Sequence, residues 1–458
     1  MGRAALQARP IHQFRITAEE TVVGRVRAVL TVQRGTMFAL AVAAVALRWR
    51  FIDFQSGDYR TFLARWWEFL ATNGHLAGLR DDSFSNYNTP YLALLALATY
   101  LPVPALAAIK TISILGDLAL AGVGSRIVAR VRPASAWAPV AAFGAVLFLP
   151  TVAMNSGVWA QCDSLYAAAG LACVLYLMKG RPWVASAWFG VAFAFKLQAV
   201  FLLPVLVGVL VVNRHRLRTL LAAPASFLAC LVPALLAGRS LASQLMVYPL
   251  QVTDSSGTGG TVGAGSGGGM PRGNPPGGGA PPGGPGAPGG GGTGGFTLND
   301  GQSFTHNAPT PYAWLPADAS VAWKYAGLAL TAAVVLAFGA WLLARHRRLS
   351  SGQVLLVAAA SALVVPLLLP EMHERYFYLA EVLLVLAGFV DRRFLLPAAG
   401  IQFASVTTYL SYLLDRPVFP LGVAAAFALA SGIGAAVLLV LALNRPHPAP
   451  TTPEAASP

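Results

Sequence analysis

Four short clusters of polar and ionisable side chains interrupt a sequence that is otherwise strongly apolar. They lie within residues 53–90, 155–164, 196–198 and 370–381. Their candidate site residues are Asp58, Tyr59, Trp66, Asn155, Gln161, Asp163, Lys196, Gln198, His373, Glu374 and Arg375. A carboxylate can serve as a general base, and cationic side chains, above all the planar guanidinium, hold phosphate oxygens well. One acidic base with several cations predicts a phosphate-bearing substrate attacked by a deprotonated nucleophile.

The first two clusters also have ordinary structural explanations. Asp58 directly precedes the helical-looking run 59–70, so a helix N-cap is as good an interpretation as a catalytic carboxylate. Trp66 fits an aromatic anchor at the membrane interface, which we favour on sequence alone. The polar residues of 155–164 suit a turn, although Gln161 and Asp163 stand at the entry to an apolar run.

The last two clusters are harder to explain structurally. Lys196 could extend along its helix to reach water, but its position is far from either end of the apolar stretch. The segment 370–381 could be an ordinary charged hairpin turn, yet it has no glycine or serine. We therefore favour a functional role for both clusters.

A pump or exchanger is the less favoured class of function, because such a protein would more often scatter acidic residues through the middle of the membrane.

The composition places these clusters in an integral membrane protein. Of the 458 residues, 56% are hydrophobic and only 11% are charged, against about 25% charged in soluble domains. The net charge of +14 comes from basic residues in short loops between apolar runs, as the positive-inside rule requires. We therefore expect membrane lipids as surroundings and no nucleic-acid partner. The three cysteines lie in apolar stretches without metal-ligand or disulfide spacing.

The basic loops predict the topology. With each of them cytoplasmic, the chain is an all-α polytopic protein with about 12 hydrophobic segments, both termini cytoplasmic and a long first outer loop at 53–90. The expected segments are 36–52, 106–128, 137–155, 160–178, two within 183–213, 217–238, 321–344, 353–370, 376–390, 393–412 and 418–443. The segment 183–213 is too short for two full spans, so two short or tilted helices should meet at Lys196. All four polar clusters then fall on the outer face. Only Arg48 and Arg50, just beyond the apolar stretch 36–47 of the first segment, fit the charge rule poorly.

The domain organisation follows from the same pattern. We expect a basic cytoplasmic segment at 1–35, a catalytic membrane module at 36–250, an outer loop at 251–320, further membrane helices at 321–445 and a cytoplasmic tail at 446–458. Within the outer loop, 255–295 is rich in glycine and proline without the collagen period, so it should be a disordered insertion. The tail reads as disordered too.

Six motifs carry a resemblance to a known family. They are SGDYRTFLARWWEFL, NYNTPYLALL, IKTISILGDL, NSGVWAQCDSLY, FAFKLQAVFLLP and MHERYFYLAEVLL, in this order between about 56 and 385. Together they resemble the bacterial membrane proteins related to glycosylphosphatidylinositol mannosyltransferases, which belong to the GT-C superfamily of glycosyltransferases. The Gly/Pro-rich insertion departs from a compact outer loop but lies between the motifs.

The resemblance implies a GT-C fold and a sugar donor carried on a polyprenyl phosphate. It further implies inverting transfer of a hexose, by default mannose, on the outer face of the plasma membrane. Asp58 matches the catalytic base, and Lys196, His373 and Arg375 would hold the lipid phosphate. Glu374 and Asp163 would shape the sugar pocket or support those cations.

Several alternatives stay open at this point. The acceptor can be a glycan, a lipid or a protein. A transporter or flippase of a lipid-linked sugar is the second hypothesis, and a non-catalytic scaffold with the same fold is the third. We expect no cofactor, and the sequence has no evident metal-ligand set, although an Mg²⁺ ion shared between a carboxylate and the phosphate stays an alternative.

Overall fold

The computed structural model describes residues 31–254, 304–316, 318–346 and 348–445. The Gly/Pro-rich stretch 255–295, the basic segment before residue 31 and the tail after residue 445 lie outside the described residues. A helix over 31–49 comes first. The elements that follow are η1 (Tyr59–Leu63), α2 (Ala64–Thr72), η2 (His75–Arg80), α3 (Thr89–Ala98), α4 (Ala105–Val131), α5 (Ala138–Leu147), α6 (Pro150–Met154), η3 (Asn155–Trp159), α7 (Asp163–Met178), α8 (Pro182–Phe195), η4 (Leu197–Leu202), α9 (Leu203–Val212), η5 (Leu217–Leu221), α10 (Ala222–Ala237), α11 (Leu241–Asp254), β1 (Thr305–His306), η6 (Pro311–Trp314), α12 (Ala322–Arg345), α13 (Ser351–Leu368), β2 (Met372–His373), η7 (Glu374–Phe377), α14 (Tyr378–Ala387), η8 (Arg392–Phe394), α15 (Leu395–Leu413) and α16 (Leu421–Leu443).

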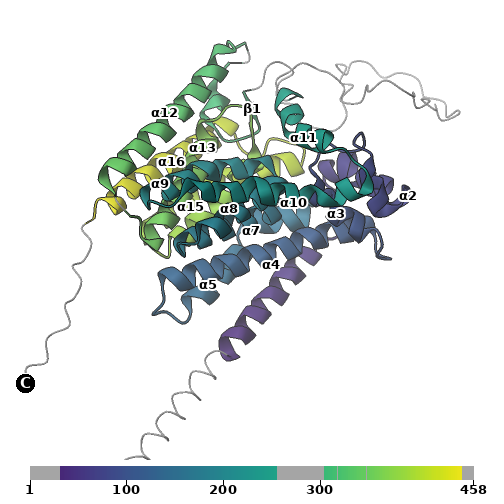
Figure 1. The fold of residues 1–458 in the computed structure, drawn as a ribbon, viewed down its shortest axis with the longest axis horizontal. Helices are drawn as coiled ribbons and strands as arrows, with labels where there is room; N and C mark the ends of the chain where they lie inside the picture. The colour runs from purple at the N-terminus through teal and green to yellow at the C-terminus, as the bar shows by residue number, and fades with distance from the viewer. Residues whose placement is uncertain (1–30, 255–303, 317, 347, 446–458) are drawn as a thin grey trace, which may run out of the picture.

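The helices form one bundle with an apolar interior. In the first part of the chain, α4 packs against α5 and α7, α7 against α8, and α8 against α10 (Figure 1). In the second part, α13 packs against α14 and α16, and α15 against α16; α13 also contacts α7 and so joins the two parts. Alanine is frequent in the buried core, which lets helix backbones approach closely in a membrane.

The helix count is lower than the sequence pattern suggested. Within the described residues, five helices are long and apolar enough to cross a membrane, namely Ala105–Val131, Leu217–Ala237, Ala322–Arg345, Ser351–Leu368 and Leu421–Leu443. A sixth span results if the bent pair Ala138–Leu147 and Pro150–Trp159 counts as one. Four further apolar helices, Thr89–Ala98, Asp163–Met178, Pro182–Phe195 and Leu197–Val212, are shorter. The architecture is that of a multi-pass all-α membrane protein, and the predicted number of twelve segments is not confirmed.

The chain is helical in two places where no span was expected. Helix α3 follows the first outer segment directly, and α11 extends the chain beyond α10 into the predicted outer loop. Conversely, the predicted span 137–155 bends by 49° at its break, since Pro150 begins a new helix. The prediction for 183–213 is confirmed, because α8 ends at Phe195 and Lys196 has an extended backbone before η4.

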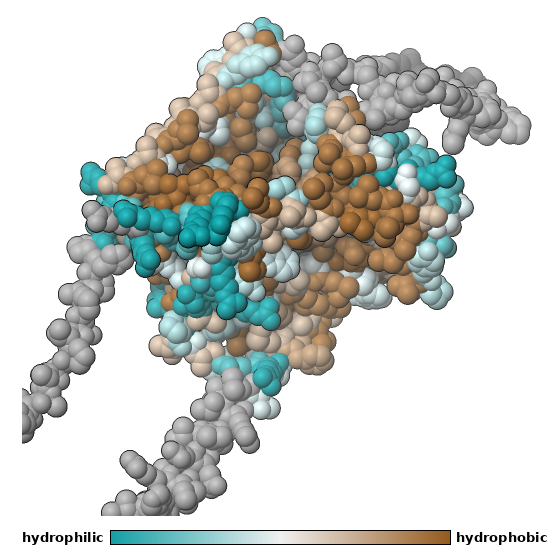
Figure 2. All heavy atoms as spheres, in the orientation of Figure 1, coloured by the Kyte–Doolittle hydropathy of each residue, from teal (hydrophilic) through white to brown (hydrophobic). Residues whose placement is uncertain are grey.

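The basic connections gather at one end of the bundle. The Arg130 guanidinium donates to the Met178 carbonyl and the Ser351 hydroxyl, each at 3.0 Å. The Leu349 amide donates to the Asn213 side chain at 2.8 Å. The polar clusters follow the opposite helix ends, where η3, α8, α13 and α15 finish. A broad apolar zone lies between hydrophilic edges on the visible face (Figure 2), as expected of a protein surrounded by lipid.

Candidate active site

The backbone before η1 presents the Asp58 carboxylate to the interior. The Ser56 hydroxyl accepts a hydrogen bond from the Tyr59 amide at 3.2 Å and donates to the Trp159 carbonyl at 2.7 Å. Ser56 therefore caps this helix start, whereas Asp58 makes no capping hydrogen bond. The capping interpretation of Asp58 is wrong, and its carboxylate is available for other contacts.

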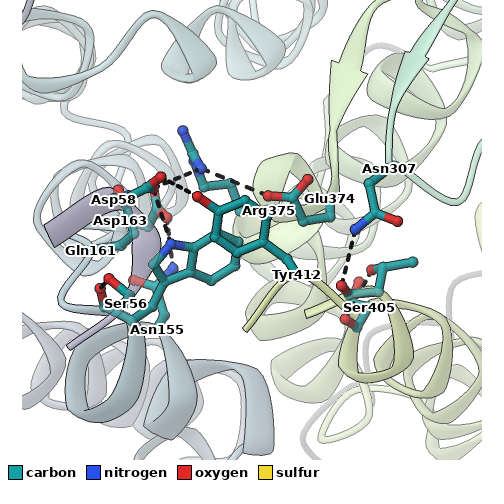
Figure 3. Close-up of polar contacts among 12 residues, drawn as sticks. Ser56, Asp58, Asn155, Gln161, Asp163, Asn307, Glu374, Arg375, Ser405 and Tyr412 are labelled. Carbon is teal, nitrogen blue, oxygen red and sulfur yellow. Dashed lines mark hydrogen bonds and ion pairs between the residues drawn. The ribbon is translucent and has the colours of Figure 1, made fainter. Parts of the chain in front are cut away.

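Four donors converge on Asp58. The Trp159 indole donates at 3.0 Å and the Arg375 guanidinium forms an ion pair at 3.4 Å. The Gln161 amide and the Tyr412 hydroxyl donate to the same carboxylate (Figure 3). Donors of this kind fix the orientation of the carboxylate. The Asp58 and Arg375 side chains keep 14% and 18% exposure, so the pair can be reached from outside the core.

A second ion pair lies beside the first. The Lys196 ammonium contacts Asp163 at 2.5 Å, and the Asn155 amide donates to the other oxygen of Asp163 at 2.7 Å. Lys196 also donates to the side-chain amide oxygen of Gln161 at 3.4 Å, so Gln161 links Asp58 to the Lys196–Asp163 pair. Buried charges at this depth need such partners. The Lys196 ammonium lies 5.6 Å from the centre of the Tyr87 ring, which adds a cation–π contact.

Irregular backbone brings these side chains together. Residues 155–159 form one π-helical turn, and Ala160 follows in the left-handed conformation with φ +67°. The backbone N–H of Gln161 donates a hydrogen bond to the Asn155 carbonyl at 2.9 Å and closes the turn. Trp159 and Gln161 consequently face the same carboxylate, although a straight helix would point them in different directions. The helix break at Lys196 likewise allows its side chain to reach Asp163.

The loop between α13 and α14 completes the site. Arg375 lies 3.7 Å from the Glu374 carboxylate and 5.5 Å from the centre of the Trp159 ring. Figure 3 shows Arg375 between the Asp58 and Glu374 carboxylates, with a contact to each. Burial raises the pKa of Glu374 to about 7, although the neighbouring Arg375 opposes this shift. Glu374 therefore changes its charge near neutral pH.

The resemblance implies that His373 binds the donor phosphate, and the structure places this residue in the same loop, directly before Glu374. Burial lowers the pKa of His373 well below 6.5, and the charges of Arg375, His306 and Lys196 act in the same direction. A neutral imidazole can give a hydrogen bond to an anionic oxygen but no charge. The ring stacks on His306, with 4.6 Å between ring centres.

A buried ion pair supports the π-helical turn from behind. Arg48 contacts Asp117 at 2.7 Å, and both side chains are 1% exposed. The Ser156 hydroxyl donates to Asp117 at 2.5 Å, and the Arg48 guanidinium also donates to the Leu147 carbonyl at 2.8 Å. Arg48, which fits the positive-inside rule poorly, is therefore a buried partner of Asp117 and not a charge of a cytoplasmic or outer loop. It joins the 31–49 helix to α4 and to the bent helix pair that carries the site.

The structure brings most of the predicted site residues into one network. The contacts above connect six of them to Asp58, namely Asn155, Gln161, Asp163, Lys196, Glu374 and Arg375. Tyr59 and Trp66 instead pack in a second apolar cluster, in which the ring centres of Trp66 and Tyr87 lie 5.0 Å apart. Gln198 lies near Tyr376, whose ring centre is 5.3 Å from that of His373.

Four residues that form or support the site were not predicted from the sequence, namely Trp159, Tyr412, Arg48 and Asp117. Trp159 stood inside a recognised motif but looked like an apolar turn residue, and Tyr412 lies 354 positions from Asp58. Arg48 and Asp117 carried a detectable signal, because charges within apolar segments need a partner. In the ranges the structure describes, no group of three or more His, Cys, Asp or Glu residues is placed to hold a metal ion.

Fold and site together define a multi-pass helical membrane protein with a charged, partly exposed site at one end of its bundle. Residues 84–261 match the family model of Glycosyltransferase family 87. No curated protein matches the chain. The family match supports the prediction of a membrane glycosyltransferase of the GT-C-like kind, acting on a sugar donor and an acceptor. The matched range includes Asn155, Gln161, Asp163 and Lys196, whereas Asp58, Arg375 and Tyr412 lie outside it.

Proposed function

We propose that this protein is an inverting hexosyltransferase that uses a polyprenyl-phosphate sugar, with mannose as the first candidate, on the outer face of the plasma membrane. The observation that carries the proposal is the Asp58 carboxylate, held by Trp159, Gln161, Tyr412 and Arg375 beside the Lys196–Asp163 pair. The resemblance to proteins related to glycosylphosphatidylinositol mannosyltransferases supports the choice of donor and sugar.

Asp58 is the proposed general base. It accepts the proton of the acceptor hydroxyl while that oxygen attacks the anomeric carbon of the sugar. The bond from this carbon to the phosphate oxygen breaks, and the polyprenyl phosphate leaves with the electron pair. Attack opposite the leaving group inverts the anomeric configuration. The partial exposure of Asp58 leaves room for the acceptor hydroxyl, and its four hydrogen-bonding partners fix the orientation of the carboxylate that acts as the base.

Lys196 and Arg375 are the proposed contacts of the donor phosphate. Arg375 forms an ion pair with Asp58, and Lys196 donates a hydrogen bond to Gln161, which in turn donates to Asp58. Negative charge grows on the phosphate as the glycosidic bond breaks, and fixed cations in a largely dry site stabilise it without reorganising. His373, as a neutral imidazole, would add a hydrogen bond. Asp163 and Glu374 would hold the two cations in place.

The outer-face assignment rests on the charge pattern. The basic connections lie at the end of the bundle opposite the site, and such connections are normally cytoplasmic. Polyprenyl-phosphate sugars on the outer leaflet would then reach the site laterally from the membrane.

Donor turnover tests the proposal. Purified protein is incubated with radiolabelled polyprenyl-phosphate mannose, glucose or galactose and a membrane-glycan acceptor fraction, with Asp58→Asn as the matched control. Transfer of label with release of polyprenyl phosphate by wild type alone supports the proposal. Movement of intact labelled donor across proteoliposomes without cleavage would instead indicate a flippase.

A further inference from the structure

The segment 304–314 returns to the site after the Gly/Pro-rich stretch and crosses the loop that carries Arg375. We call it the strap. Its strand β1 pairs in parallel with β2, with Thr305 opposite Met372 and His306 opposite His373. The Glu371 amide donates to the Phe304 carbonyl at 2.7 Å. Backbone hydrogen bonds therefore join the strap to the 371–375 loop.

Further contacts fix the strap to the bundle. The Asn307 amide donates to the Thr408 carbonyl at 3.0 Å, the Tyr312 hydroxyl to the Leu368 carbonyl at 2.6 Å, and the Trp314 indole to the Gly422 carbonyl at 3.0 Å. Ala308 and Thr310 are fully buried. These contacts reach the ends of α13 and α15 and the start of α16, so the strap is built into the site end of the molecule.

The loop beneath the strap needs external support. Glu371 has φ +60°, an uncommon and costly conformation for a residue with a side chain. Two contacts oppose its relaxation, namely the backbone bond to Phe304 and an ion pair with Lys324 at 2.7 Å. His373, Glu374 and Arg375 follow this strained residue within four positions of the sequence.

His306 provides the contact nearest to the proposed phosphate site. Its ring stacks on the His373 ring at 4.6 Å with 19° between planes, and His373 in turn contacts Tyr376 at 5.3 Å. Figure 3 places Asn307, the next strap residue, on the same side of Arg375 as Glu374. Stacking fixes the orientation of a ring that would otherwise rotate freely.

We propose that the strap is a positioning element of the site, in which His306 holds the His373 ring and the 371–375 loop in the arrangement that binds the donor phosphate. The nature of the ligand rests on the proposed function, whereas the support of the loop does not. His306 acts through His373 and is therefore a positioning residue.

Amide hydrogen exchange tests the support of the loop without any substrate. In purified full-length protein, His306→Ala should increase exchange at residues 371–376, and His306→Phe, which keeps a ring for stacking, should leave it near wild type. His75→Ala is the matched control, because His75 also stacks on an aromatic ring, Tyr100, at 4.1 Å, away from this loop. Unchanged exchange at 371–376 in His306→Ala would overturn the proposal.

Donor kinetics test the consequence for binding. With polyprenyl-phosphate mannose, His306→Ala should raise the donor KM by about tenfold with kcat little changed, since binding in the ground and transition states is weakened alike. His306→Phe should recover most of this loss. Equal impairment of both variants would show that the ring nitrogens, not stacking, matter, and would overturn the positioning role. If wild type transfers no sugar, the proposed function fails, while the exchange result still decides the role of the strap.

Discussion

At the scale of single residues, the site is organised around a carboxylate that the local backbone leaves free. Ser56 takes the capping role next to Asp58, and the four donors to Asp58 come from three distant parts of the chain. The role of Asp58 as a base and the effect of Glu374 burial can each be tested by substitutions that keep side-chain size.

Asp58→Asn should remove the base while preserving the shape of the side chain. We expect transfer at least about a hundredfold slower, because general base catalysis typically contributes 10²–10⁴-fold, with donor binding retained. The measurement is kcat with saturating donor, accompanied by thermal unfolding. Asp53→Asn, at an exposed position five residues earlier, is the control and should have little effect. Near-normal transfer by Asp58→Asn would exclude it as the base.

Glu374→Gln should change how stability depends on pH. Burial raises the pKa of Glu374 from 4.5 to about 7, so the folded protein holds this proton more tightly than the unfolded chain. Ionisation in the unfolded state therefore lowers stability as pH rises from about 4.5 to about 7. Glu374→Gln avoids this loss.

We expect the Tm of the Glu374→Gln variant, relative to wild type, to be higher at pH 8 than at pH 5. Thermal unfolding of detergent-purified protein at the two pH values measures this difference. A difference that is equal at both pH values would mean that Glu374 titrates alike in the folded and unfolded states.

At the scale of elements, the site depends on helices that are interrupted. Lys196 stands at the break between α8 and η4, and the π-helical turn at 155–159 follows the bent α5–α6 pair. Interrupted helices leave backbone groups without regular partners, so they are tolerated in membranes only where protein covers them. The Arg48–Asp117 pair supplies this support for the turn.

Asp117→Asn should therefore destabilise the protein strongly. It leaves the Arg48 charge buried without its partner, a change that typically costs about 3–5 kcal/mol. The double variant Arg48→Met with Asp117→Leu removes both charges and should recover much of the lost stability. Thermal unfolding of both variants measures this coupling. Equal stability of Asp117→Asn and wild type would show that the pair contributes nothing to the support of the turn.

At the scale of the whole molecule, the bundle has two chemically different ends. Basic connections meet at one end, and the four polar clusters lie toward the other. This polarity is the basis for placing the site on the outer face, and it can be tested in intact cells.

An engineered cysteine at Asp82 should react with an impermeant thiol reagent added from outside, while one at Arg348 should not. Both positions are exposed, so accessibility of the side chain does not limit either reaction. The parent chain is the control for its native cysteines, of which Cys162 and Cys173 are buried. Labelling at Arg348 with protection at Asp82 would invert the proposed topology.

The sequence by itself determined the class of the molecule and most of its helices. Long uncharged runs can only be membrane helices, since lipid offers no partners to other backbone structures. The same reasoning predicted the break at Lys196, because 183–213 is too short for two full spans and carries a charge in its middle. It also identified the clusters that contain Asp58, Asp163, Lys196 and Arg375.

Only the tertiary structure decided which side chains meet. Periodicity describes one helix at a time, so it could not show that Tyr412 reaches Asp58 or that Arg48 pairs with Asp117. It also could not decide between the two interpretations of Asp58, because Ser56 and Asp58 are equally good caps by composition. The strap was missed for the same reason. Its contacts with the 371–375 loop join residues more than 60 positions apart, and such contacts are set by packing, not by local sequence preference.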